Sequence, residues 1–383
     1  MLSRLQDFLS RHRRKFIVTG VLVGGTIFAA RYAQRRFVEF QEKQAREFFE
    51  RTRRMTHFES TEKTCNQVIL GMGEEMCQAV LRECSTDELL EQLRQNPKNK
   101  LELWEEMKIV AFTRLATYVY ASSMLVIALR VQLNLLGGYI YRDIMTEQKQ
   151  VTDELKQQYL SLIRHFITES GIRDLARYIR SQVIAVIKAM PLSQQLSLND
   201  LEQLFWSLQM AINADTRRDP NSRMSKYLLP SQNPSHSPML QKMFNETLDL
   251  LESEDAIGVC SHNVSRGFVL ACDAIAESMG ETLQHMPQAE LQTQQDNLKF
   301  NQAGCSRSNS SKSQNVENNN LLNINRVLMA LAKLIPIISG LTSRGFDSTA
   351  RPHNLPTQLL TFYVVAEKTK TLGANVYESF SSA

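Results

Sequence analysis

Cysteine and histidine have the most scope for catalysis or metal binding, and in this chain they are scattered. The seven histidines lie apart from one another, and Cys260 and His262 form the one close cysteine–histidine pair. A tetrahedral metal site needs four ligands, so a single pair is too few. The sequence also lacks the nucleophile-elbow, zincin, phosphate-loop and dinucleotide-binding motifs. It therefore predicts neither an enzyme nor a metal or cofactor site.

The cysteines are spread along the chain without any Cys-x-x-Cys motif. They are Cys65, Cys77, Cys84, Cys260, Cys272 and Cys305. A disulfide-stapled secreted domain is short and dense in cysteine. This distribution instead predicts reduced thiols facing the cytosol.

The clearest pattern for binding chemistry lies within residues 85–114. Ser85 with Glu88, and Asn99 with Glu102, have the spacing of capping boxes. The sequence Asn-Pro-Lys-Asn, which ends at Asn99, separates the two. The pattern predicts two helices that meet at a short turn.

These two helices are expected to bring Leu93 and Trp104 together in one groove at the end of a helical bundle. Trp104 stands among three glutamates near the start of its helix, where a tryptophan is more often partly exposed than buried. A partly exposed tryptophan beside an apolar groove is typical of a binding anchor. The alternative is that Trp104 is a core residue, and the spacing alone leaves both interpretations open.

Helices must position these residues, because the apolar periodicity of the body is helical. Amphipathic or apolar helices are predicted for residues 65–84, 153–190, 198–212, 321–339 and 356–380. Alternating runs bounded by Asn-Gly turns are absent, which predicts no sheet. The predicted fold is therefore all-α, a bundle of long helices with an N-terminal transmembrane helix.

Three further stretches qualify this bundle. Residues 215–238 and 287–320 are polar breaks, and the second is predicted to be disordered because it is rich in Gln, Asn and Ser. Residues 115–129 form an uncharged apolar run bracketed by Arg114 and Arg130. Fifteen residues are too few for an unaided membrane span. A central helix buried by its neighbours is the simpler prediction, with a second span as the alternative.

Another apolar run, at residues 16–33, predicts a permanent membrane anchor. At 1.5 Å per residue it covers about 27 Å, close to the roughly 30 Å of a hydrocarbon core. A cleaved signal peptide is the alternative, but no cut after the alanines that end the run leaves a small residue at the −3 position. A mitochondrial presequence would be amphipathic, and this run is not. The expected anchor residues are Phe16, Ile17, Val18, Val21, Leu22, Val23, Ile27 and Phe28.

Positive charge gathers around this anchor. Residues 1–46 contain ten Lys and Arg against three Asp and Glu, whereas the rest of the chain carries 34 against 37. A nucleic-acid binder needs its basic stripe on the folded body, so this class is excluded. Arg31, Arg35 and Arg36 are expected to contact anionic lipid headgroups. Basic residues flank both ends of the run, so charge alone leaves its orientation open.

Six segments carry a more specific signature. They are HFES (57–60), TCN (64–66), NKLELWEEMKIVAFTR (99–114), LRVQLNLLGGYIYRD (129–143), LAKLIPII (331–338) and ANVYESF (374–380). Together they resemble the peroxin-3 family of peroxisomal biogenesis factors. The resemblance extends from the anchor to the C-terminus, and the segment at 129–143 is its most specific part. Only the two polar breaks and their neighbours match the family poorly, and residues 287–320 depart from its pattern.

The resemblance implies an integral protein of the peroxisomal membrane. Its layout would be a short lumenal tail at 1–15, a transmembrane anchor at 16–33, a basic juxtamembrane helix at 34–56 and a cytosolic helical-bundle domain at 57–383. The basic residues that flank the anchor would also serve as the peroxisomal address.

The resemblance further implies a partner, the farnesylated shuttle peroxin-19, which carries newly made membrane proteins. Its N-terminal amphipathic helix would fill the apolar groove at the end of the bundle. The family's groove positions match Leu93, Lys100, Trp104 and Lys333 here. A membrane-anchored lipid-binding or lipid-transfer protein is the alternative from another class, and it would contain an internal apolar cavity.

Overall fold

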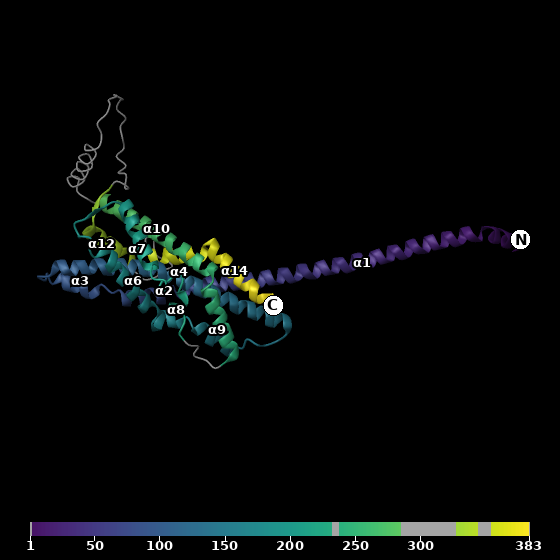
Figure 1. The fold of residues 1–383 in the computed structure, drawn as a ribbon, viewed down its shortest axis with the longest axis horizontal. Helices are drawn as coiled ribbons and strands as arrows, with labels where there is room; N and C mark the ends of the chain where they lie inside the picture. Colours follow the sequence, from purple (N-terminus) through teal and green to yellow (C-terminus); the bar gives the residue numbers. More distant parts are fainter. Residues whose placement is uncertain (1, 232–236, 285–326, 344–353, 383) are drawn as a thin grey trace, which may run out of the picture. The chain divides into compact units, whose positions relative to one another are not determined.

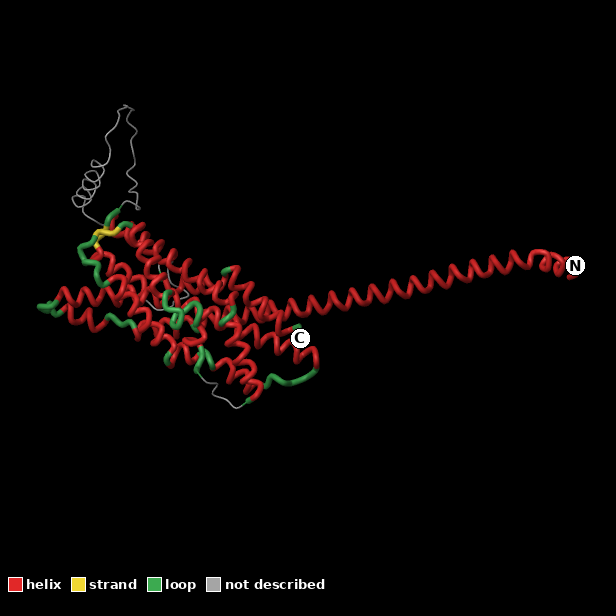
Figure 2. Tube along the Cα trace, in the orientation of Figure 1, coloured by secondary structure: helices red, strands yellow, loops and turns green. Residues whose placement is uncertain are grey.

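The computed structural model describes residues 2–231, 237–284, 327–343 and 354–382. The polar stretch at 287–320 lies outside the described residues. The described chain is almost entirely helical, which confirms the all-α prediction (Figure 2). It divides into two units, Met1–Glu59 and Ser60–Ala383.

The first unit consists of the N-terminal part of helix α1, which runs from Leu2 to Gly71. The backbone is helical across residues 16–33, as a membrane span requires, whereas the side chains of residues 16–27 lie outside the described part. Further along, Arg36 pairs with Glu39 and Arg46 with Glu42 at helical spacing. Four exposed phenylalanines lie on the same stretch: Phe37, Phe40, Phe48 and Phe49.

The second unit is built around α4, Lys100–Thr146 (Figure 1). Residues 107–139 of this helix are buried without interruption. Its neighbours include α2 (Gly73–Glu83), α6 (Gly171–Ile187), α10 (Glu254–Gln284), α12 (Leu331–Thr342), α13 (Leu355–Val365) and α14 (Glu367–Ser381). Helix α4 is long and apolar enough to cross a membrane, but its apolar window is wholly buried by the protein. The prediction of a buried central helix at 115–129 is confirmed.

Shorter elements complete the described bundle. They are α3 (Asp87–Arg94), α5 (Asp153–Ser161), the π-helix η1 (His165–Glu169), α7 (Leu198–Asn213), α8 (Met224–Leu228) and α9 (Pro238–Leu251). The prediction of no sheet is wrong in one small place. Strands β1 (Gln195–Leu196) and β2 (Met329–Ala330) form an antiparallel two-residue ladder.

Several predicted helices begin or break elsewhere. The helix predicted at 65–84 breaks at Met72, which lies between Gly71 and Gly73, and glycine is a poor helix former. Residues 321–326 of the helix predicted at 321–339 lie outside the described residues, and the described helix begins at Leu331, because the two residues before it pair with β1. The one predicted at 356–380 is divided at Ala366, whose backbone is extended.

The helix predicted at 153–190 is divided by the π-helix η1. The backbone N–H of Ser170 donates to the carbonyl of His165, which is the i to i+5 pattern of a π-turn. The next residue, Gly171, touches the backbone of α8 so closely that a Cβ there would lie 2.3 Å from the Tyr227 carbonyl oxygen. This contact joins segments that are distant in the sequence, so the local residue pattern could not predict it.

Candidate functional site

The two helices predicted within residues 85–114 are α3 and the start of α4. The connection between them turns at Asn96, whose φ of 56° lies in the left-handed region that asparagine tolerates. Helix α4 begins at Lys100 with Asn99 as its N-cap residue, as the sequence predicts. The helix–turn–helix arrangement is therefore confirmed.

The side-chain hydrogen bonds of the two predicted capping boxes are absent from this part of the structure. Helix α3 has Thr86 as its N-cap, and Ser85 Oγ instead accepts from the Asp87 N–H at 3.2 Å. This is the short-range turn that serine also favours, and it displaces the expected bond. The Asn99 side chain likewise makes no cap bond. A complete capping box occurs instead at Ser197 and Asp200, at the start of α7.

A surface pocket of about 440 Å³ lies between α2, α3, α4 and α12, and is named the Trp104 pocket here. Its apolar wall includes Leu81, Leu90, Trp104, Met107, Ile335 and Pro336. Helix α12 supplies the wall opposite α3, so the pocket joins segments that lie more than 200 residues apart in the chain.

Apolar side chains around this pocket are unusually accessible. Helix α3 contains no fully buried residue, although Leu89 and Leu93 pack against the core. Leu90 is 41% exposed and Leu101 is 68% exposed. Leu101 lies three residues before Trp104, so both side chains fall on the same face of α4. Leu90 and Leu101 therefore add exposed apolar side chains to the two helices that bring Trp104 to the pocket.

A buried arginine holds the α12 wall in place. Arg114 is 2% exposed, and its guanidinium group donates to the Ser339 carbonyl at 3.0 Å, to Ser339 Oγ at 2.7 Å and to Thr342 Oγ1 at 3.0 Å. Burial lowers the pKa of Arg114. These three acceptors are on α12, and the guanidinium group also donates to Thr86 Oγ1 at 3.5 Å, so Arg114 links α4 to α12 and to the start of α3.

The structure separates the four predicted groove residues into two groups. Trp104 is half-buried and lines the pocket, so it is neither a core residue nor a fully exposed one. Leu93 is half-buried on α3, Lys100 is exposed at the first residue of α4, and Lys333 is exposed on α12. These three do not line the Trp104 pocket, although all lie on its helices.

The sequence patterns did not identify four of the lining residues, Leu90, Arg114, Ile335 and Pro336. Leu90 had a usable signal, because it belongs to the apolar pattern of α3. The α12 residues had no local signal, and only the family resemblance, through Lys333, placed a residue of that helix at the groove.

The cysteines are placed for packing and not for reactivity. Cys65, Cys77, Cys84, Cys260 and Cys272 are free thiols and are buried, whereas Cys305 lies outside the described residues. Burial raises the pKa of Cys260 to about 12, and its sulfur accepts a hydrogen bond from Ser123 Oγ at 3.6 Å. Among the described residues, no three His, Cys, Asp or Glu side chains are grouped to hold a metal ion.

Fold and site together define an all-helical bundle with an apolar surface pocket between α3, α4 and α12. A family model of peroxin-3 matches residues 7–99, 94–143 and 141–341. The chain is 32% identical to peroxisomal biogenesis factor 3 of Mus musculus over 402 residues, which cover 100% of this chain and 98% of the relative. It is 32% identical to peroxisomal biogenesis factor 3 of Homo sapiens over 409 residues, with the same coverage.

A more distant relative is peroxisomal biogenesis factor 3 of Yarrowia lipolytica, at 21% identity over 72% of this chain and 84% of the relative. The chain belongs to the peroxin-3 family and is a peroxisomal biogenesis factor.

Proposed function

We propose that this chain is a membrane-anchored docking receptor for the shuttle peroxin-19, which delivers newly made proteins to the peroxisomal membrane. The observation that carries the proposal is the half-buried Trp104 in an apolar pocket between α3, α4 and α12. An amphipathic helix binds such a surface through anchors at i, i+3, i+4 and i+7. The receptor acts by binding and not by catalysis.

The side chains in and around the pocket have different roles in this mechanism. Trp104 supplies the central apolar anchor, and Leu90 and Leu101 extend the surface that a partner helix would cover. Leu93 supports this face from α3. Lys100 and Lys333 are exposed on helices that border the pocket, where they would attract an acidic partner and orient its approach.

The membrane arrangement is part of the same proposal. Residues 16–33 would span the peroxisomal membrane as a single pass, with residues 1–15 in the lumen and the helical bundle in the cytosol. Arg31, Arg35 and Arg36 are exposed on the helix that continues from the span, where anionic headgroups would be within reach. Phe28, which is 75% exposed, would lie against lipid.

The alternative of a lipid-transfer protein needs an enclosed apolar cavity. Among the cavities that open on the described residues are four of about 330 to 690 Å³, and charged side chains line each of these four. Such linings suit peptides or polar ligands better than acyl chains. These cavities therefore favour the receptor function.

The chain's two tryptophans provide a matched test. Trp104→Ala should weaken binding of purified peroxin-19 to the detergent-solubilised full chain by roughly 30- to 1,000-fold, because a binding hot spot is worth about 2–4 kcal/mol. Trp206→Ala is the control, because Trp206 is 65% exposed on α7 and does not line the pocket. It should leave the affinity unchanged.

Thermal melting of the same samples separates binding from folding. Trp104 is only half-buried, so its loss should lower the stability less than the roughly 3–5 kcal/mol expected for a core tryptophan. Equal affinities of the two variants would remove Trp104 from the site. A collapsed melting transition for Trp104→Ala would make the residue structural.

A further inference from the structure

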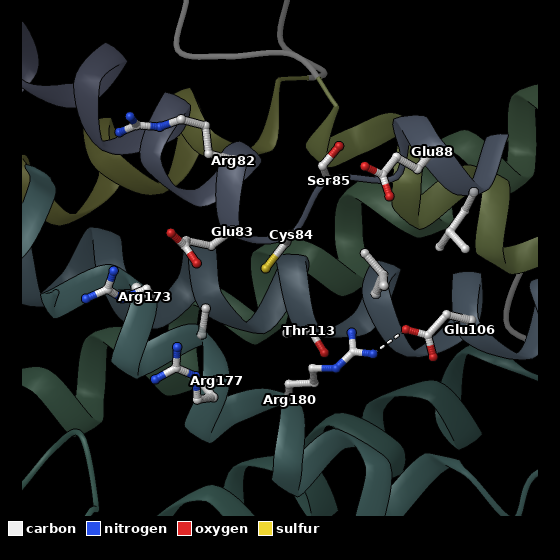
Figure 3. Close-up of a pocket in the computed structure, with 13 residues that line it drawn as sticks. Arg82, Glu83, Cys84, Ser85, Glu88, Glu106, Thr113, Arg173, Arg177 and Arg180 are labelled. Atoms are coloured by element: carbon white, nitrogen blue, oxygen red, sulfur yellow. Dashed lines mark hydrogen bonds and ion pairs between the residues drawn. The ribbon is translucent and has the colours of Figure 1, made fainter. Parts of the chain in front are cut away.

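A second pocket lies beside the Trp104 pocket and is named the arginine pocket here (Figure 3). It encloses about 500 Å³ between the end of α2, the start of α3, α4 and α6. Ser85 lines both pockets, so the α2–α3 connection separates them. Neither the peroxin-19 proposal nor the anchor makes use of this second pocket.

Arginine dominates one wall of the pocket. Arg173, Arg177 and Arg180 are spaced at i, i+4 and i+7 on α6, which puts them on one face of the helix. Arg180 forms an ion pair with Glu106, and Arg177 forms one with Asp174 at 3.2 Å. Arg173 and, on α2, Arg82 have no ion-pair partner among the described residues.

The charged groups are unevenly distributed within the pocket. The side chains of Arg82, Glu83, Arg173 and Arg177 lie toward one end, with the guanidinium group of Arg82 apart from those of Arg173 and Arg177, whereas Ser85 and Glu88 lie toward the other end (Figure 3). Arg173 is also in the first turn of α6, a 17-residue helix whose N-terminus carries the positive end of the helix dipole. At this end of the pocket Arg82 and Arg173 have no ion-pair partner among the described residues, whereas Arg177 is paired with Asp174, so the carboxylates of Glu83 and Asp174 both compete for the arginines.

We propose that the basic end of the arginine pocket binds the phosphate group of an organic phosphate monoester. Arginine pairs with phosphate through two parallel N–H···O bonds, and two arginines one turn apart are placed to hold one group. A phosphate monoester carries about two negative charges at neutral pH and three strong acceptor oxygens, so it would compete with the Glu83 and Asp174 carboxylates for these arginines better than a single carboxylate would. Leu89, Val110 and Ala176 provide an apolar surface for the organic part of the ligand. The Glu83 carboxylate lines the same pocket and would compete with the phosphate for these arginines.

Isothermal titration calorimetry on the detergent-solubilised full chain tests the proposal. Glycerol 3-phosphate is the soluble probe, and dihexanoyl phosphatidic acid is the lipid probe with the same phosphate monoester. The double variant Arg173→Gln, Arg177→Gln should lose at least tenfold in affinity for the phosphate, because charge-assisted hydrogen bonds to it are lost. Both side chains are exposed, so the fold should persist. Glu83→Gln should raise the affinity severalfold, because it removes a competing anion.

A matched double variant, Arg164→Gln with Arg217→Gln, removes the same charge from exposed positions outside the pocket. It should bind both probes as the wild type does. Pocket-dependent binding of glycerol 3-phosphate supports a soluble ligand, and pocket-dependent binding of the lipid probe alone supports a headgroup. Absence of binding to both probes, or equal losses in the two double variants, overturns the proposal.

The result is independent of the receptor proposal. The arginine variants should leave peroxin-19 affinity unchanged, and Trp104→Ala should leave phosphate binding unchanged. Each proposal can therefore fail while the other stands.

Discussion

Two buried arginines, Arg114 and Arg130, connect the two ends of the apolar run at 115–129 to neighbouring helices. Arg114 is tied to α12, and Arg130, which is 1% exposed, donates to the Val364 carbonyl at 2.9 Å and lies 3.8 Å from the Glu62 carboxylate. A burial this deep is tolerated only when the charge is paired and hydrogen-bonded. In the sequence these two cations bracket an apolar run, as they would at the ends of a membrane span. In the structure they join α4 to its neighbours instead.

The two tryptophans make a related point about exposure. Trp206 is 65% exposed on α7, yet it lines none of the four cavities described above, whereas the less exposed Trp104 lies in one. Binding anchors gain affinity from pockets that exclude water around them. Trp104 differs from Trp206 because it lines a pocket, and not because it is more exposed.

The buried thiols should resist alkylation in the folded chain. Burial raises the pKa of Cys65 and Cys84 to about 11, and that of Cys260 and Cys272 to about 12. Only the thiolate reacts, so at pH 7.5 its fraction is lower than that of an ordinary thiol by roughly a hundredfold or more. Mass-spectrometric mapping after iodoacetamide treatment should find these four cysteines unmodified.

The same chain unfolded in guanidinium chloride is the control, and there all four should be labelled. Their ready modification in the folded chain would contradict the described burial.

At the scale of helices, the sequence pattern predicted those helix ends that depend on neighbouring residues in the chain. The predicted start of α4 after Asn99 and the predicted extent of α7 agree with the structure within one residue, although the Asn99 side chain makes no cap bond. The break before Gly171 could not be predicted, because it depends on the backbone of α8.

The same limit applies to the site. Trp104 was identified from its helix, but the opposite wall comes from α12, and the hydrogen bond that places it joins Arg114 to Thr342 across 228 positions. The sequence indicates Trp104 as an anchor residue, whereas the pocket is formed by helices that are distant in the sequence and meet in the folded chain.

Close packing of α14 on α4 gives a test at this scale. A Cβ at Gly138 would lie 2.7 Å from the Phe380 Cβ and 3.0 Å from the Phe380 carbonyl carbon, so the backbone of α14 would have to shift. Gly138→Ala should therefore lower the free energy of unfolding by about 1–3 kcal/mol, the usual cost of overpacking. Thermal melting of the full chain measures this loss.

Gly258→Ala is the matched control, because a Cβ at that helical position meets no atom within 4 Å. It should stabilise the chain by up to about 1 kcal/mol, since alanine is the better helix former. Equal melting temperatures for the two variants would show that α14 does not pack on α4 this closely.

At the scale of the whole molecule, charge and apolar surface are divided between the two units. The ten basic residues of positions 1–46 exceed the acidic ones by seven, while the rest of the chain has a net charge of −3. Both pockets discussed above are formed by residues of the unit Ser60–Ala383. An N-terminal segment dedicated to membrane attachment and a body dedicated to binding is the division of labour that the receptor proposal requires.

The proposed anchor is tested by extraction of cell membranes at alkaline pH. The wild-type chain should stay in the membrane pellet after carbonate treatment, because residues 16–33 would span the bilayer. The double variant Leu22→Lys, Ile27→Lys should be released, because each lysine near the centre of a span costs about 2.5–3.5 kcal/mol on insertion. The matched double variant Phe37→Lys, Phe40→Lys adds the same charge beyond the proposed span, at residues that are 61% and 56% exposed, and should stay in the pellet. Release of the wild-type chain, or a mature chain that begins after residue 30, would show that this helix is not a permanent anchor.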